Sequence, residues 1–166
     1  MTTQNEFIEF ISKLAPEGEV ALLVRQKPKL KDGQYDYHAD GALKCTWPAM
    51  LPTARIKDDW AIYGNTASFI IDRFVDGHPS ASAANCEYVL VMVLDDVGTD
   101  KAPNIPDLKP TWVMETSEGS FQWGYAFSEQ PTKAQFTAAI KAIADAGYTD
   151  PGAINAVRNF RIPGSV

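Results

Sequence analysis

The segment that most constrains the fold is Cys86–Asp96, which reads CEYVLVMVLDD. Its apolar part, Tyr88–Leu94, is continuous and rich in β-branched residues, and the turn-forming sequence Val97–Thr99 follows it. An apolar run of this length between polar residues is typical of a strand that is buried on both faces. The sequence therefore predicts a central strand that ends in two adjacent carboxylates, Asp95 and Asp96.

These two carboxylates would stand on a rigid element at a point that still reaches solvent. Carboxylate oxygens are preferred ligands of hard divalent cations, so such a pair is suited to a metal site. An Asp-Asp pair after a strand is also ordinary turn chemistry, because Asp hydrogen-bonds its own backbone and ends strands well. Taken alone, Asp95 and Asp96 leave both interpretations open.

Length and composition are those of an ordinary globular protein. The 166 residues suit one domain, and 45% hydrophobic with 22% charged residues is a normal balance. The sequence has no apolar run long enough for a transmembrane helix and no basic, then apolar, secretory signal. Cys45 and Cys86 form no paired motif, which indicates reduced thiols in the cytoplasm. Because the only histidines are His38 and His78, no zinc site is expected.

The formal net charge of −6 is unusual for a stand-alone nucleic-acid binder, which normally carries a basic patch. The charge fits an enzyme whose acidic residues partly bind metal. It also fits a domain whose main contact with nucleic acid lies elsewhere. One basic run, Lys27–Lys31 (KPKLK), suits either a solvated loop or contact with a phosphate backbone.

Local patterns predict a mixture of helices and short strands. Periodic apolar residues predict helices over 6–14, 67–75 and 132–146. Asn65 or Thr66 is the expected N-cap of the second helix. Besides the Cys86–Asp96 segment, strands are expected over 19–26, 60–63, 111–116 and 121–127. The last two are expected to form a hairpin around the turn 117–120.

Three further motifs follow the two aspartates. They are the turn Glu115–Gln122 (ETSEGSFQ), Asp150, and the closing segment Arg158–Ser165 (RNFRIPGS). Together with Leu94–Asp96, this order resembles the archaeo-eukaryotic primases, in particular the RepB-type primases of plasmids and phages and the related primase–polymerases. The resemblance covers Tyr88–Val166, about half of the chain.

The resemblance implies an α/β (α+β) fold, with a mostly antiparallel central sheet of the RNA-recognition-motif type flanked by helices. It also implies that Asp95, Asp96 and Asp150 are catalytic and bind Mg²⁺ or Mn²⁺. Asp150 precedes Pro151-Gly152, however, so it is equally well placed to initiate a turn. The closing RIPGSV looks like a longer family motif cut short, so the chain is expected to be one catalytic domain, 1–166, from the N-terminal part of a longer replication protein.

The nucleoside triphosphate needs hydrogen-bond donors, and a guanidinium fork or turn N–H groups supply them. The residues expected to bind the nucleotide are Ser117, Gly119, Ser120, Gln122, Arg158 and Arg161. The broad superfamily has a Ser-x-His motif at the position of this turn, and the chain has no histidine there, as in RepB-like relatives. Without the resemblance, the serines and the glycine suit a simple turn, and the arginines suit solvated positions or ion pairs with nearby acids.

The function implied is primer synthesis: metal-dependent nucleotidyl transfer on a single-stranded DNA template, in phage or plasmid replication in the bacterial cytoplasm. The expected partners are the template and nucleoside triphosphates, with a helicase domain or protein as a further candidate and no membrane. Two alternatives remain from the residues themselves. One is a non-catalytic nucleic-acid-binding module on the same fold, and the other is a metal-dependent nuclease that uses the same carboxylates.

Overall fold

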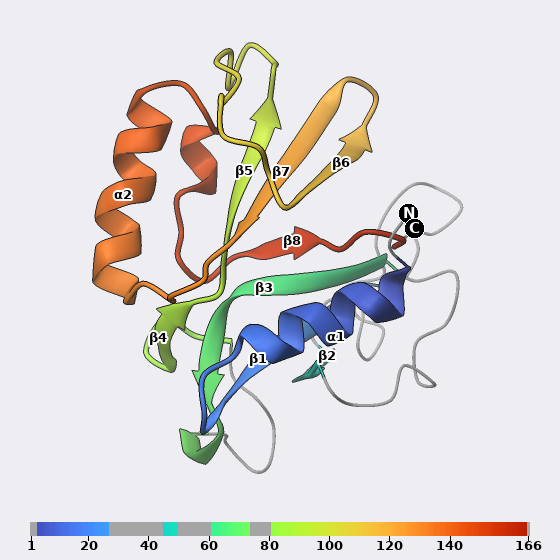
Figure 1. Cartoon of the computed structure of the whole chain (residues 1–166), viewed down its shortest axis with the longest axis vertical. Helices are drawn as coiled ribbons and strands as arrows, with labels where there is room; N and C mark the ends of the chain where they lie inside the picture. Colours follow the sequence, from blue (N-terminus) through green and yellow to red (C-terminus); the bar gives the residue numbers. More distant parts are fainter. Residues whose placement is uncertain (1–2, 27–44, 50–60, 74–80, 166) are drawn as a thin grey trace, which may run out of the picture.

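Two antiparallel sheets and two α-helices form the described part of the chain (Figure 1). The structure is a computed structural model that describes residues 3–26, 45–49, 61–73 and 81–165. The basic run Lys27–Lys31 and both histidines lie outside the described residues, so the interpretations of these segments stay predictions.

The larger sheet is arranged around one long strand, β3. Its strands are β1 (Glu19–Gln26), β2 (Cys45–Pro48), β3 (Ala61–Ile70), β4 (Cys86–Val89) and β8 (Asn159–Arg161). The order is β2-β1-β3-β4, and every pairing is antiparallel. One edge of β3 pairs with β1, whereas the other edge is shared by β8 and β4. The strand β8 thereby joins the sheet beside β4, on the edge of β3 that faces away from β1.

The smaller sheet carries the predicted hairpin. It consists of β5 (Val91–Val97), β6 (Trp112–Ser117) and β7 (Ser120–Ala126), in the order β5-β7-β6. Both pairings are antiparallel, and Ser117 and Ser120 close the turn of the β6–β7 hairpin. The hairpin predicted around residues 117–120 is confirmed.

The segment predicted as one central strand is divided at Leu90. The N–H group of Leu90 donates to Thr66 O in the larger sheet (2.8 Å), and its carbonyl accepts from the N–H of Phe127 beyond β7 (3.3 Å). The chain thus passes from β4 in one sheet to β5 in the other. Among the described strands β5 pairs with β7 alone, so the prediction of a central strand is wrong, although apolar side chains are buried on both of its faces.

Each helix covers the apolar face of one sheet. Helix α1 (Gln4–Leu14) begins in a capping box formed by Thr3 and Glu6, and it lies along the larger sheet (Figure 1). Its buried side chains join a core between the two sheets, which we call the inter-sheet core. The buried members of this core are Phe7, Ile8, Ile11, Ala21, Leu23, Ala49, Ile62, Leu90, Val91, Val93, Phe160 and Ile162.

Helix α2 (Lys133–Asp145) also begins in a capping box, formed by Thr132 and Gln135. Phe136 and Ile140 project from it into a second core, against the other face of the smaller sheet. Helix α2 therefore packs against the face of β5 and β7 opposite the inter-sheet core (Figure 1).

The helix predicted over residues 67–75 is wrong, because residues 67–70 belong to β3 and the next three, Ile71–Arg73, form a short 3-10 turn. The polar residues that look like N-caps bind the C-terminal segment instead. Thr66 Oγ1 donates to Ala156 O (2.7 Å), and the side-chain amide of Asn65 donates to Asn159 Oδ1 (3.0 Å). Both side chains are buried, so partners distant in sequence override the local helical pattern.

The predicted fold class, a mixture of helices with mostly antiparallel strands, is confirmed. None of the helices in the described segments is long and apolar enough to cross a membrane.

Candidate active site

Asp95 and Asp96 lie in a bulge at the end of β5. The register between β5 and β7 shifts between Leu94 and Val97, and Asp96 has φ 56°, the one positive value among described residues other than glycine. Such a backbone costs about 1 kcal/mol or more, so the surrounding structure has to hold it. Thr99 does so, because its N–H and its hydroxyl both donate to Asp96 O (3.1 and 2.7 Å).

Asp150 is brought to this bulge by backbone hydrogen bonds. Its N–H donates to Asp95 O (3.1 Å), and the N–H of Asp95 donates to the hydroxyl of the fully buried Thr149 (2.9 Å). The Asp150 carboxylate also accepts from the N–H of Gly152 (2.7 Å) and caps a short 3-10 turn, η3 (Pro151–Ala153). The sequence left two alternatives for Asp150, a turn former or a partner of the other aspartates. In the structure Asp150 both caps a turn and lies beside Asp95.

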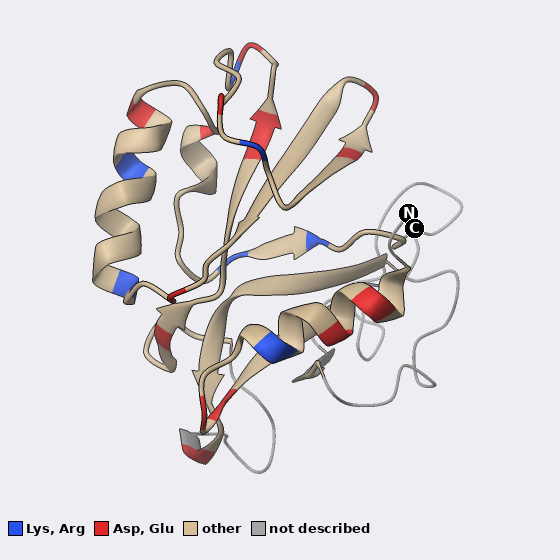
Figure 2. Cartoon of the chain, viewed as in Figure 1, with Lys and Arg blue, Asp and Glu red and all other residues tan. Residues whose placement is uncertain are grey.

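A lysine that the sequence analysis did not single out joins two of these carboxylates. Lys101 Nζ lies 2.8 Å from Asp96 Oδ2 and 3.3 Å from Asp150 Oδ2. The loop that carries it folds back after β5, because the N–H of Gly98 donates to Ala102 O (2.8 Å). Figure 2 shows the acidic end of β5 with basic positions in the loop beyond it. The sequence did contain a signal for this contact. Lys101 follows Asp96 by five residues, and the Gly98-Thr99 pair between them favours a turn that brings the chain back.

The ammonium group of Lys101 affects the titration of its neighbours. The pKa of Asp96 is lowered, first by the hydrogen bond from Lys101 and then by the hydrogen bond from Ser120. The pKa of Lys101 is raised, because its ammonium donates to Asp96 and Asp150. Both shifts favour the charged forms, so the pair is ionised at neutral pH.

Arg158 neutralises the remaining aspartate, Asp95, through an ion pair between Nη2 and Asp95 Oδ2. Its other terminal nitrogen points to the carbonyls of Val93 and Ala153 (3.5 and 3.4 Å). The backbone of Arg158 is held as well, since its N–H donates to the hydroxyl of Thr66 (3.0 Å). Arg158 is thus fixed beside the carboxylates.

Arg161 is placed differently from Arg158. It lies in β8 opposite Tyr63, with its guanidinium carbon 6.0 Å from the centre of the Tyr63 ring. Within the described segments it forms no ion pair with a carboxylate. The structure therefore brings one of the two predicted arginines to the aspartates.

The β6–β7 hairpin contributes one direct contact to the aspartates. Ser120 Oγ donates to Asp96 Oδ1 (2.5 Å), so both oxygens of that carboxylate have donors. Gly119 has φ 72° at the tip, and its N–H donates to Glu115 Oε1 (3.0 Å). Ser117 is exposed beside the tip.

Gln122 points inward from the same hairpin, and its side chain is buried. Its amide oxygen has no hydrogen-bond partner among the described residues. Of the four hairpin residues predicted to bind nucleotide, Ser120 alone touches an aspartate.

The donor set suits a hard divalent cation. The described residues contain no group of three or more His, Cys, Asp or Glu side chains already placed to hold an ion. However, a cation does stand between two carboxylates, since the Lys101 ammonium is bound to Asp96 and Asp150. Carboxylate oxygens are the ligands that Mg²⁺ and Mn²⁺ prefer, so the chemistry of these donors, and not a preformed geometry, points to a divalent cation.

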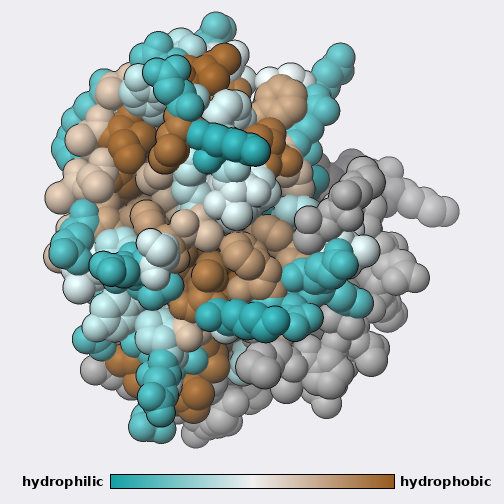
Figure 3. All heavy atoms as spheres, in the orientation of Figure 1, coloured by the Kyte–Doolittle hydropathy of each residue, from teal (hydrophilic) through white to brown (hydrophobic). Residues whose placement is uncertain are grey.

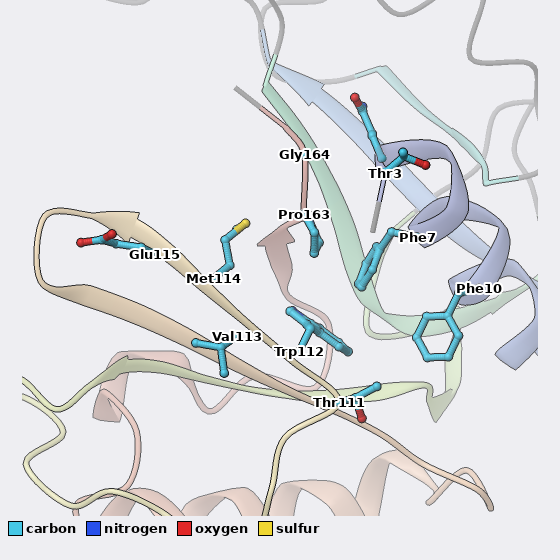
Figure 4. Close-up of a pocket in the computed structure, with 11 residues that line it drawn as sticks. Thr3, Phe7, Phe10, Thr111, Trp112, Val113, Met114, Glu115, Pro163 and Gly164 are labelled. Carbon is cyan, nitrogen blue, oxygen red and sulfur yellow. The ribbon is translucent and has the colours of Figure 1, made fainter. Parts of the chain in front are cut away.

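An apolar groove runs between α1 and the base of the β6–β7 hairpin (Figure 4). It has a volume of about 960 Å³. Phe7, Phe10, Trp112, Met114 and Pro163 line it, and Trp112 packs edge-on against Phe7 with 4.9 Å between ring centroids. Apolar residues gather beside α1 on this face of the molecule (Figure 3). The same hairpin therefore reaches the aspartates at its tip and this groove at its base.

Comparison with known proteins gives one informative likeness. No protein-family model matches the chain, and no curated protein matches it in sequence. Among solved structures, the chain is similar to the AEP domain of the primase–polymerase (PrimPol) of cyanophage S-2L, with a TM-score of 0.58 and 15% identity. The match covers 98% of this chain and 83% of that domain. At this identity the likeness shows a shared fold.

Proposed function

We propose that this chain is a primase-like catalytic domain that joins nucleotides on a single-stranded DNA template in a reaction dependent on Mg²⁺ or Mn²⁺. The observation that carries the proposal is the convergence of three aspartates from two separate segments around bound cationic groups. Asp95 and Asp96 come from the end of β5, and Asp150 comes from the turn after α2. The shared fold with a primase–polymerase domain makes primer synthesis the preferred use of such a centre.

In this proposal Asp95, Asp96 and Asp150 hold the metal, which when bound supplies charge neutralisation for the attacking and leaving oxygens of phosphoryl transfer. Ser120 orients Asp96, because it donates to one of the two carboxylate oxygens. Arg158 orients Asp95 through the ion pair and is close enough to the aspartates to bind a phosphate oxygen as well. These roles follow from positioning and charge, which account for most of the catalysis in this chemistry.

The proposal includes the nucleotide-binding roles predicted from sequence for the remaining residues, which are Ser117, Gly119, Gln122 and Arg161. The unpaired amide oxygen of Gln122 supports one such role, because this acceptor is free to take a hydrogen bond from a nucleotide hydroxyl group. The N–H of Gly119 would have to exchange Glu115 for a phosphate. The RepB-type branch, a helicase partner and the place in phage or plasmid replication also remain proposals, drawn from the sequence motifs.

A primer-synthesis assay on single-stranded DNA, with labelled nucleotides and Mn²⁺, tests the proposal. We expect Asp96→Asn to lower the rate by about 100-fold or more, because one metal-binding oxygen is replaced by an amide. The matched control is Asp145→Asn, which removes an aspartate paired with Lys141 at the same 2.8 Å on the outer face of α2. Equal synthesis by the wild type and Asp96→Asn, or none by the wild type, would contradict the proposal.

One observation favours a second candidate, a non-catalytic nucleic-acid-binding module. Lys101 and Arg158 already bind all three aspartates, as they would in a centre that has lost its metal. Such a module would gain no thermal stability from Mn²⁺ plus a nucleoside triphosphate, whereas an enzyme would. Cleavage of DNA with metal alone would instead support the nuclease alternative.

A further inference from the structure

Lys101 has a position that the proposed reaction does not explain. Its ammonium lies between Asp96 and Asp150, where a cation shared by those two carboxylates would be bound. We propose that Lys101 occupies the metal position in the metal-free protein and competes with the divalent ion for it. This inference rests on the proposed function, because it concerns the affinity of the same site for its metal.

The two carboxylates are held in place without help from Lys101. The backbone of Asp96 is fixed by Thr99, and one of its carboxylate oxygens accepts from Ser120. The backbone of Asp150 is fixed by Asp95 O, and its carboxylate caps η3. Removing the ammonium therefore leaves two positioned carboxylates, whose oxygens can serve as ligands of a hard cation alongside water.

The two cationic side chains of the centre differ in how easily they leave. The Lys101 side chain is 64% exposed, and among the described residues its ammonium pairs with the two carboxylates. The Arg158 side chain is 17% exposed and also contacts two backbone carbonyls. An exposed ammonium on a flexible stem gives up its ion pairs at small cost. Lys101 is thus the exchangeable cation and Arg158 the resident one.

The charge balance of the centre favours this exchange. With Lys101 and Arg158 in place, two of the three carboxylate charges are compensated. A divalent ion in the position of Lys101, with Arg158 retained, compensates all three. The exchange therefore removes the residual negative charge, and the lysine weakens metal binding without preventing it.

The test is direct measurement of Mn²⁺ binding, without nucleotide or DNA, by titration calorimetry or by the spectroscopic signal of free Mn²⁺. We expect Lys101→Met to bind Mn²⁺ about five- to tenfold more tightly than the wild type, because no ammonium has to be displaced from two exposed ion pairs. The matched control is Lys141→Met, which removes the equally exposed lysine of the Lys141–Asp145 pair on α2. The control should leave the affinity unchanged.

The outcomes separate this inference from the function on which it rests. If Lys101 served to position the carboxylates, Lys101→Met would bind Mn²⁺ more weakly than the wild type. Weaker or unchanged binding by this variant would overturn the inference about Lys101 but would leave the proposed function intact. If neither the wild type nor Lys101→Met binds Mn²⁺, the proposed function fails as well. Thermal melting without metal checks that the variant folds, and added Mn²⁺ should raise its melting temperature more than that of the wild type.

Discussion

The aspartate centre at the end of β5 and the inter-sheet core beneath Trp112 are stabilised by different interactions. In the centre, opposite charges and backbone hydrogen bonds fix partly exposed side chains, and the pKa of Asp96 is lowered because its charged form is bound. In the core, aromatic and aliphatic side chains pack together and exclude water. The ring centroids of Trp112 and Phe160, for example, are 5.7 Å apart. The β6–β7 hairpin belongs to both regions.

This difference indicates how changes in the two regions should behave. Substitutions in the centre change charge and ligands on a backbone that other contacts hold, so they should affect binding and catalysis more than folding. Substitutions in the core change packed volume, so they should affect folding first.

The largest effect on stability is expected at Gly124, in the part of the hairpin that belongs to the core. A methyl group there would lie 2.0 Å from two ring atoms of Trp112, so the indole would have to move. We expect Gly124→Ala to lower the free energy of unfolding by about 3 kcal/mol, measured by urea denaturation. The control is Gly119→Ala at the tip, where no atom lies within 4 Å and the cost, about 1 kcal/mol, comes from its positive φ. Equal losses would contradict this difference between the two regions.

A smaller effect is expected at Arg158, which belongs to the centre but is mostly buried. Arg158→Met should lower the free energy of unfolding by about 1–3 kcal/mol, because it leaves Asp95 without its cation. The double variant Arg158→Met/Asp95→Asn should lose about 1 kcal/mol less stability than the sum of the losses of the two single variants. Arg161→Met, the control, should cost less than about 1 kcal/mol, since its described contact is with the Tyr63 ring. Strict additivity of the first pair would show that the ion pair does not stabilise the fold.

The smallest effect on stability is expected at Cys86, whose thiol group is buried among apolar side chains. Burial raises the pKa of its thiol from 9.0 to about 11, so the neutral form is favoured in the folded protein. Its contribution to stability is complete below pH 9 and is lost as the pH rises toward 11. At pH 8 the native protein should therefore show almost no alkylation of Cys86 by iodoacetamide, located by peptide mass spectrometry. Rapid alkylation before unfolding in urea would contradict this assignment.

The sequence predicted the residues of the centre better than it predicted their partners. Asp95 and Asp96 were predicted to lie at a strand end because a long apolar run ends at them. Asp150 was predicted from the resemblance to the archaeo-eukaryotic primases. Lys101 was missed, since its approach to the aspartates depends on how the 98–102 loop folds back. Arg158 and Arg161 looked equivalent in sequence, but in the structure Arg158 precedes β8 and pairs with Asp95, whereas Arg161 lies in β8 opposite Tyr63.

The errors in the fold have the same origin. Asn65 and Thr66 are good helix caps locally, but the structure uses them to bind residues about 90 positions later. The split of Cys86–Asp96 at Leu90 depends on hydrogen bonds to Thr66 in β3 and to Phe127 just after β7, neither of which is close in sequence. The hairpin and the helix α2 were predicted closely, because turn residues and apolar periodicity within each segment determine them.

The position of Mn²⁺ in crystals of the protein, located by anomalous scattering, tests most directly whether the aspartates form a metal site. We expect a peak within about 2–2.5 Å of carboxylate oxygens of Asp96 and Asp150, with the Lys101 ammonium displaced from them. Absence of a peak there at saturating Mn²⁺, with Lys101 still bound between the two aspartates, would contradict this expectation.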